Sequence, residues 1–177
     1  MKSEFTKNYF ELFGLPPAFR IETARLDNAY RQLQSQVHPD RFAAATDAEK
    51  RISMQWATRA NEAYQTLKRP LSRARYLLAL RGVDTQEETN TAMPADFLIA
   101  QMEWREAVSD ARANRDVAEL DRVADNLRAS ESTLLIDLEE HLDGDGNLPA
   151  AALQVRKLRF VEKLREEIAD AQEVMEN

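Results

Sequence analysis

The chain has no cysteine among its 177 residues. It therefore forms no disulfide, offers no thiol nucleophile, and has no cysteine ligand for zinc or for an iron–sulfur cluster. We accordingly expect neither a bound cofactor nor a metal site in this chain. If the protein takes part in a process that involves a metal, we expect another protein to bind that metal.

Glycine and proline are also scarce, at four and six residues, while apolar residues make up 44% of the chain. Sandwiches and barrels need more turn residues than this, so the composition favours helices around an apolar core. No apolar run approaches the length of a membrane span, and the first ten residues lack the apolar segment of a signal peptide. We expect a cytosolic protein that does not bind membranes.

Positive charge is concentrated in the first half and negative charge in the second. Residues 1–82 hold 14 Lys and Arg against 8 Asp and Glu, whereas residues 83–177 hold 10 against 23. A change of sign this large suggests two domains with different partners.

Apolar residues recur at helical spacing along most of the chain, which predicts an all-α fold. The polar, aperiodic stretch 83–93 is interpreted as a linker between domains at 1–82 and 94–177. Short connections make successive helices antiparallel, so the second domain is predicted to be a three-helix bundle. The expected helices are a short one ending at Gly14 and longer ones over 23–37, 46–70, 71–80, 95–113, 116–142 and 149–175.

The tripeptide His38-Pro39-Asp40 separates the second and third helices, which are expected to form an antiparallel hairpin. Proline disfavours helical geometry at the preceding residue and has no N–H, so the helix ends here and the loop displays an imidazole and a carboxylate. With its basic neighbours, such a tip suits an acidic partner surface. Taken alone, the tripeptide is equally compatible with a simple helix end. The basic neighbours are Arg25, Arg31 and Arg41.

Two longer segments, 8–15 (NYFELFGL) and 60–67 (ANEAYQTL), flank this tripeptide. In order and spacing, the three together resemble the J-domain of DnaJ-type co-chaperones. The resemblance implies that the tripeptide contacts the ATPase domain of a DnaK-type chaperone and stimulates ATP hydrolysis. Arg41 stands where that family often has lysine, which keeps the cation but changes how the side chain bonds.

The expected helix over 95–113 carries a second candidate surface. Its core stripe is assigned to Phe97, Trp104, Val108 and Ala111. Off this stripe lie Leu98, Ile99 and Met102, in line with Glu103, Glu106 and Asp110. An exposed apolar patch beside an acidic row is a candidate binding surface, although the patch is also compatible with packing on another helix or on the first domain. On the last helix, Phe160 flanks the core stripe and is assigned to neither core nor surface.

Residues 8–16 and 155–165 make the whole chain resemble the HscB family, the J-type co-chaperones of iron–sulfur cluster assembly. The resemblance implies that the J-domain recruits an HscA-type chaperone and that the bundle binds an IscU-type scaffold. Eukaryotic relatives add a targeting segment and a cysteine-rich motif, so we expect a bacterial cytoplasmic protein, monomeric and without enzyme activity. The implied chaperone-binding residues are His38, Pro39, Asp40, Arg25, Arg31 and Arg41. The implied scaffold-binding residues are Leu98, Ile99, Met102, Glu103, Glu106, Asp110 and Phe160.

Other functions fit the sequence less well. A nucleic-acid binder would need more unpaired cations, and the acidic second half would repel phosphate. An enzyme using His38 and Asp40 would lack an enclosed pocket at a hairpin tip, and His141 is expected only to cap a helix. The loop from Asp143 begins like an EF-hand but has Leu148 and Gln154 where glycine and glutamate are required. One alternative function stays open, a J-domain adaptor that serves a different client.

Overall fold

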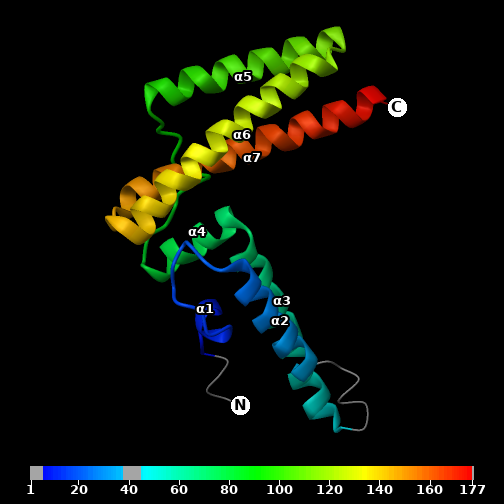
Figure 1. Cartoon of the computed structure of the whole chain (residues 1–177), viewed down its shortest axis with the longest axis vertical. Helices are drawn as coiled ribbons and strands as arrows, with labels where there is room; N and C mark the ends of the chain where they lie inside the picture. The colour runs from blue at the N-terminus through cyan, green and yellow to red at the C-terminus, as the bar shows by residue number, and fades with distance from the viewer. Residues whose placement is uncertain (1–5, 38–44, 177) are drawn as a thin grey trace. The chain divides into compact units, whose positions relative to one another are not determined.

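The computed structural model describes residues 6–37 and 45–176, and these ranges contain helices and turns but no strand (Figure 1). The predicted all-α fold is confirmed. The chain divides into two compact units, Met1–Leu77 and Leu78–Asn177. Within the described ranges, no helix has the length and apolar character needed to cross a membrane. The domain limits at residues 82 and 93 stay a prediction.

The first unit opens with α1 (Tyr9–Leu12), a single helical turn. Asn8 begins it by a capping box, since its side chain accepts from the N–H of Glu11 at 3.0 Å while the Glu11 carboxylate accepts from the N–H of Asn8 at 2.8 Å. Gly14 follows with a φ of 61°, a left-handed conformation that glycine adopts without strain. The turn therefore ends where the sequence predicted.

The hairpin consists of α2 (Thr23–Val37) and α3 (Asp47–Lys68), which lie side by side (Figure 1). Contacts run from Lys68 against Asp27 at one end to Ser53 against Val37 at the other, so the two helices are antiparallel. Val37 is also the last residue before the undescribed segment 38–44, so the helix end expected from Pro39 stays a prediction.

The helix α4 (Pro70–Leu80) carries two side chains that hold the N-terminal segment of the first unit. Arg73 is buried and donates from Nε to the carbonyl oxygen of Phe19 at 2.7 Å. Tyr76 stacks on Tyr9 at 4.5 Å between ring centroids and accepts a hydrogen bond from its N–H at 2.9 Å. Among the side chains that form the core of this unit are Phe10, Phe13, Phe19, Leu26, Trp56, Leu67 and Leu71.

The second unit is a three-helix bundle of α5 (Ala95–Asn114), α6 (Val117–Glu139) and α7 (Leu148–Glu176). Hydrogen bonds from Gln172 to Asp121 and from Gln154 to Asp137 make α6 and α7 antiparallel. In contrast, α5 and α7 are parallel, because Phe97 contacts Phe160 and Arg105 contacts Glu167, in the same order along both helices. Among the buried side chains of the bundle are Leu120, Leu127, Leu138, Leu158, Leu164 and Ile168.

The two connections of the bundle are short. Between α5 and α6, Arg115 adopts a left-handed conformation with a φ of 54°, and Asp116 accepts from the N–H of Glu119 at 3.0 Å to begin α6. Between α6 and α7, a π-helical turn spans Glu140–Gly144. The regular helix predicted to residue 142 therefore ends earlier, at Glu139, and the chain continues in wider hydrogen-bonded rings.

Candidate functional site

The hairpin is held by a polar and aromatic cluster near its base. Tyr30 and Tyr64 stack at 4.1 Å between ring centroids, and the Tyr30 hydroxyl donates to Asn61 at 2.7 Å. The Tyr64 hydroxyl donates to Asp27 at 2.9 Å, and Lys68 lies 3.2 Å from the same carboxylate oxygen. The Tyr64 hydrogen bond and then the Lys68 ammonium hold the pKa of Asp27 below its ordinary value.

Both ends of the loop between α2 and α3 are fixed by side chains of α3 or its cap. Ser53 is buried and donates to the carbonyl oxygen of Val37, the last residue of α2, at 2.7 Å. Thr46 forms the predicted capping box with Glu49, whose carboxylate accepts from the N–H of Thr46 at 2.9 Å. His38, Pro39, Asp40 and Arg41 lie outside the described residues, so their predicted role stays a prediction.

The two remaining basic candidates of the first unit are exposed residues of α2. Arg25 donates from Nη2 to the carbonyl oxygen of Gly14 at 3.2 Å, which connects the start of α2 to the turn after α1. Arg31 donates from Nη2 to Asn28 at 2.6 Å. Both side chains are exposed and remain accessible to an acidic partner.

The apolar patch on α5, formed by Leu98, Ile99 and Met102, is exposed. These residues are 42%, 58% and 71% accessible, respectively. Their predicted position off the core stripe is confirmed, because Phe97, Val108 and Ala111 on the opposite side of the helix are buried. The patch thus leaves three large apolar side chains in contact with water next to one another on α5.

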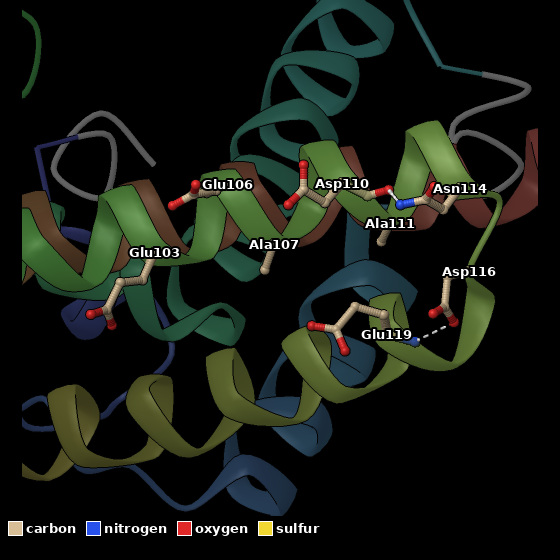
Figure 2. Close-up of a pocket in the computed structure, with 8 residues that line it drawn as sticks. All are labelled: Glu103, Glu106, Ala107, Asp110, Ala111, Asn114, Asp116 and Glu119. Atoms are coloured by element: carbon tan, nitrogen blue, oxygen red, sulfur yellow. Dashed lines mark hydrogen bonds between the residues drawn. The ribbon is translucent and has the colours of Figure 1, made fainter.

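The acidic row of Glu103, Glu106 and Asp110 lines one wall of a cleft between α5 and α6 (Figure 2). The cleft has a volume of about 440 Å³, and Asp116, the N-cap of α6, and Glu119 of α6 form part of the opposite wall. Among the described side chains that line it, none is lysine or arginine. In Figure 2 the Glu106 and Asp110 carboxylates lie on the side of α5 away from α6, and Glu119 pairs with Arg122 of α6 at 2.6 Å. The acidic row on α5 suits a cationic group of a partner.

Phe160 of α7 belongs to an aromatic cluster with Phe97 and Trp104 of α5. Its ring lies 6.5 Å from the Trp104 ring at an interplanar angle of 22°, and 6.0 Å from the Phe97 ring at 80°. The guanidinium of Arg105 lies over the Phe160 ring at 5.1 Å from its centroid. Phe160 and Trp104 are both partly exposed, so the core position predicted for Trp104 is only partly correct and Phe160 lies at the edge of the core.

Family models match both units. A model described as "DnaJ domain" matches residues 8–76, and a model described as "HSCB C-terminal oligomerisation domain" matches residues 93–169. A "Co-chaperone protein HscB homolog" of Azoarcus sp. is 52% identical over 177 residues and is aligned over all of both chains. The chain belongs to the HscB co-chaperone family. Membership with a J-domain implies an Hsp70-type chaperone partner.

Further members of the HscB family are similar along nearly the whole chain. The homolog of Chromobacterium violaceum is 58% identical over 171 residues, 97% of each chain. The solved structure "Chaperone HscB from Vibrio cholerae" superposes with a TM-score of 0.83 at 38% identity, over 96% of this chain and 99% of that one. The resemblance read from the sequence is therefore confirmed at the level of the family and of the fold.

Three residues of the hairpin and of the cleft were not identified from the sequence, namely Ser53, Asp116 and Glu119. Ser53 was not recognised because a serine within a helix has no local pattern that reveals a cross-helix hydrogen bond. Asp116 and Glu119 were not joined to the acidic row because they precede or open a different helix. The predicted helix over 116–142 already placed Asp116 at its start, but helical spacing does not show which residues of α5 lie opposite.

Proposed function

We propose that this HscB-family protein binds an IscU-type iron–sulfur scaffold and delivers it to an HscA-type chaperone. The chaperone then hydrolyses ATP, closes on the scaffold and promotes transfer of the cluster to acceptor proteins. The protein itself catalyses no covalent chemistry, holds no cluster, and acts as a monomer in the bacterial cytoplasm. We assign the protein to the bacterial cytoplasm because the relatives named above come from bacteria.

One observation carries the scaffold assignment. Leu98, Ile99 and Met102 leave three large apolar side chains in water beside an acidic cleft, in a chain of the HscB family. Apolar side chains at the centre of an interface supply most of its affinity, and charges at its rim direct the approach of the partner. We assign the apolar contacts to this patch and Phe160, and the charged contacts to Glu103, Glu106 and Asp110.

The J-domain half of the proposal assigns chaperone binding to His38, Pro39, Asp40 and Arg41, with Arg25 and Arg31 as cationic neighbours. The match of residues 8–76 to the DnaJ domain supports this assignment. So does the exposure of Arg25 and Arg31 on α2. Exposed basic side chains increase the rate at which an acidic surface is found.

The test is the steady-state ATPase rate of an HscA-type chaperone at physiological salt. The chaperone is measured alone, with this protein, with an IscU-type scaffold, and with both. The series is repeated with His38→Gln, which keeps a polar side chain but removes the imidazole. Strong stimulation by the pair that is lost in His38→Gln is the expected result.

Two other outcomes separate the halves of the proposal. Stimulation that the scaffold does not enhance would keep the J-domain function and remove the assigned client, leaving an adaptor for a different client. No stimulation in any mixture would overturn the proposed function as a whole.

A further inference from the structure

Phe160 is the one apolar member of the proposed scaffold surface that does not come from α5. We propose that Trp104 and Arg105 of α5 are positioning residues that hold the Phe160 ring in the place where the scaffold meets it. This inference rests on the proposed function. It adds two residues that act by holding the Phe160 ring.

The contacts of Trp104 define the first part of this support. Its ring lies nearly parallel to that of Phe160, at 6.5 Å and 22°, and edge-on to that of Phe97, at 6.1 Å and 80°. Phe97 is also edge-on to Phe160. Offset-parallel and edge-on arrangements are the favoured geometries of aromatic pairs, so each ring restricts the rotation of the other two.

The contacts of Arg105 define the second part. Its guanidinium lies over the Phe160 ring at 5.1 Å, within the range of a cation–π interaction. The same side chain reaches Glu167 of α7 at 3.8 Å between Nη1 and Oε2. Arg105 and Trp104 thus contact one ring of α7 from consecutive positions of α5.

The position of Arg105 also connects Phe160 to the apolar patch. Leu98, Met102 and Arg105 are spaced by four and then three residues, so their side chains form one row along α5. The Phe160 ring lies under the last member of this row. A scaffold seated on Leu98 and Met102 therefore meets Arg105 next, and with it the Phe160 ring that Arg105 covers.

Holding the ring in advance has a thermodynamic consequence. A partly exposed phenylalanine that rotates freely in the unbound protein loses that freedom when a partner covers it, and this loss reduces affinity. The aromatic cluster and Arg105 restrict the ring before binding. Removing either support is expected to weaken scaffold binding even where the bundle stays folded.

The experiment measures the affinity of the full-length protein for an apo IscU-type scaffold by isothermal titration calorimetry. The variants are Trp104→Leu, Trp104→Phe and Arg105→Gln, each also combined with Phe160→Ala. Arg112→Gln is the matched control, because Arg112 is an exposed arginine on α5 that lines the same groove as Arg105. Among the described side chains, no aromatic ring lies under Arg112. Urea unfolding of each variant reports whether the bundle remains folded.

We expect Trp104→Leu and Arg105→Gln to raise the dissociation constant about threefold to tenfold. Trp104→Phe should restore most of the affinity, and Arg112→Gln should leave it unchanged. In the Phe160→Ala background, Trp104→Leu and Arg105→Gln should have little further effect, because the ring that they hold is absent. A purely structural role would not produce this loss of additivity.

The inference is wrong if Phe160→Ala weakens binding while Trp104→Leu and Arg105→Gln do not, or if their effects add fully to that of Phe160→Ala. Where Trp104→Leu fails to fold, Arg105→Gln decides, because it changes an exposed side chain. A wild-type protein that does not bind the scaffold would remove the proposed function together with this inference, and that outcome is distinct from a failure of the variants alone.

Discussion

The hydroxyl of Ser53 on α3 donates to the carbonyl oxygen of Val37, the last residue of α2, at 2.7 Å. A donor from α3 thus reaches a main-chain oxygen at the described end of α2. Val37 directly precedes His38 in the chain. The hydrogen bond therefore fixes the point from which the proposed chaperone-binding loop starts.

Ser53→Ala removes this donor and leaves a carbonyl of the part-buried helix end without its partner. We expect a loss of about 1 kcal/mol in the free energy of unfolding, and a weaker stimulation of chaperone ATPase at subsaturating protein. Ser35→Ala is the control, because the Ser35 hydroxyl donates to a carbonyl within α2 itself at an exposed position. Equal stability of Ser53→Ala and the wild type in urea would show that the bond does not hold the helix end.

Met102→Ser tests the apolar patch. Met102 is 71% accessible, so its replacement should leave the unfolding free energy nearly unchanged. We expect the dissociation constant for the scaffold to rise about tenfold, as for a residue near the centre of an interface. The control is Ile136→Ser on α6, which is 70% accessible but lies outside the patch. Equal effects of the two substitutions on scaffold binding would contradict the assignment.

Neutralising the acidic row tests the charged half of the surface. The triple substitution Glu103→Gln, Glu106→Gln and Asp110→Asn should slow association with the scaffold and flatten its dependence on salt, because it removes long-range attraction. The dissociation rate should change less. Stopped-flow measurements at several salt concentrations give both rates. The control neutralises Glu166 and Asp170, which are exposed on α7, and should leave the salt dependence in place.

Asp27 makes the stability of the hairpin dependent on pH. The Tyr64 hydroxyl and the Lys68 ammonium hold its pKa below the ordinary 3.8. A carboxyl with a lowered pKa in the folded state stabilises the fold above the ordinary value and loses that contribution as pH falls through the lowered value. The unfolding free energies of wild type and Asp27→Asn should therefore differ at neutral pH and converge in acid.

Urea unfolding across the acid range measures this difference, and Tyr64→Phe provides a second observation. It removes the first donor to Asp27, so a nuclear magnetic resonance titration should find the pKa of the carboxyl closer to its ordinary value. A difference between wild type and Asp27→Asn that stays constant into strong acid would rule out this source of pH dependence.

The sequence was sufficient where a boundary is set by local chemistry. The pair of Thr46 and Glu49 predicts the start of α3, because a capping box acts on residues within one turn. The π-helical turn was missed, since such turns have no simple composition pattern. There a Cβ on Gly144 would lie 2.7 Å from a carboxylate oxygen of Glu140, a contact visible only in three dimensions.

Periodicity was less informative wherever the outcome depends on a neighbouring helix. The heptad-like spacing of residues 117–142 predicts a core stripe that begins at Val117, but Val117 is exposed, whereas Val123 lies outside that stripe and is buried. The spacing of residues identifies a face of one helix, not how far a second helix covers it. For the same reason, the contact between Trp104 and Phe160 depends on the relative rotation of α5 and α7, and neither helix contains that information alone.

The two tryptophans of the chain are divided between its two units. Trp56 lies in the core of the first unit at 5% accessibility, and Trp104 lies in the partly exposed aromatic cluster of the second. The intrinsic fluorescence of single-tryptophan variants can therefore follow the melting of each unit separately, without an added dye. Two coincident transitions would indicate that the units unfold as one cooperative system, and two separate ones would give each its own stability.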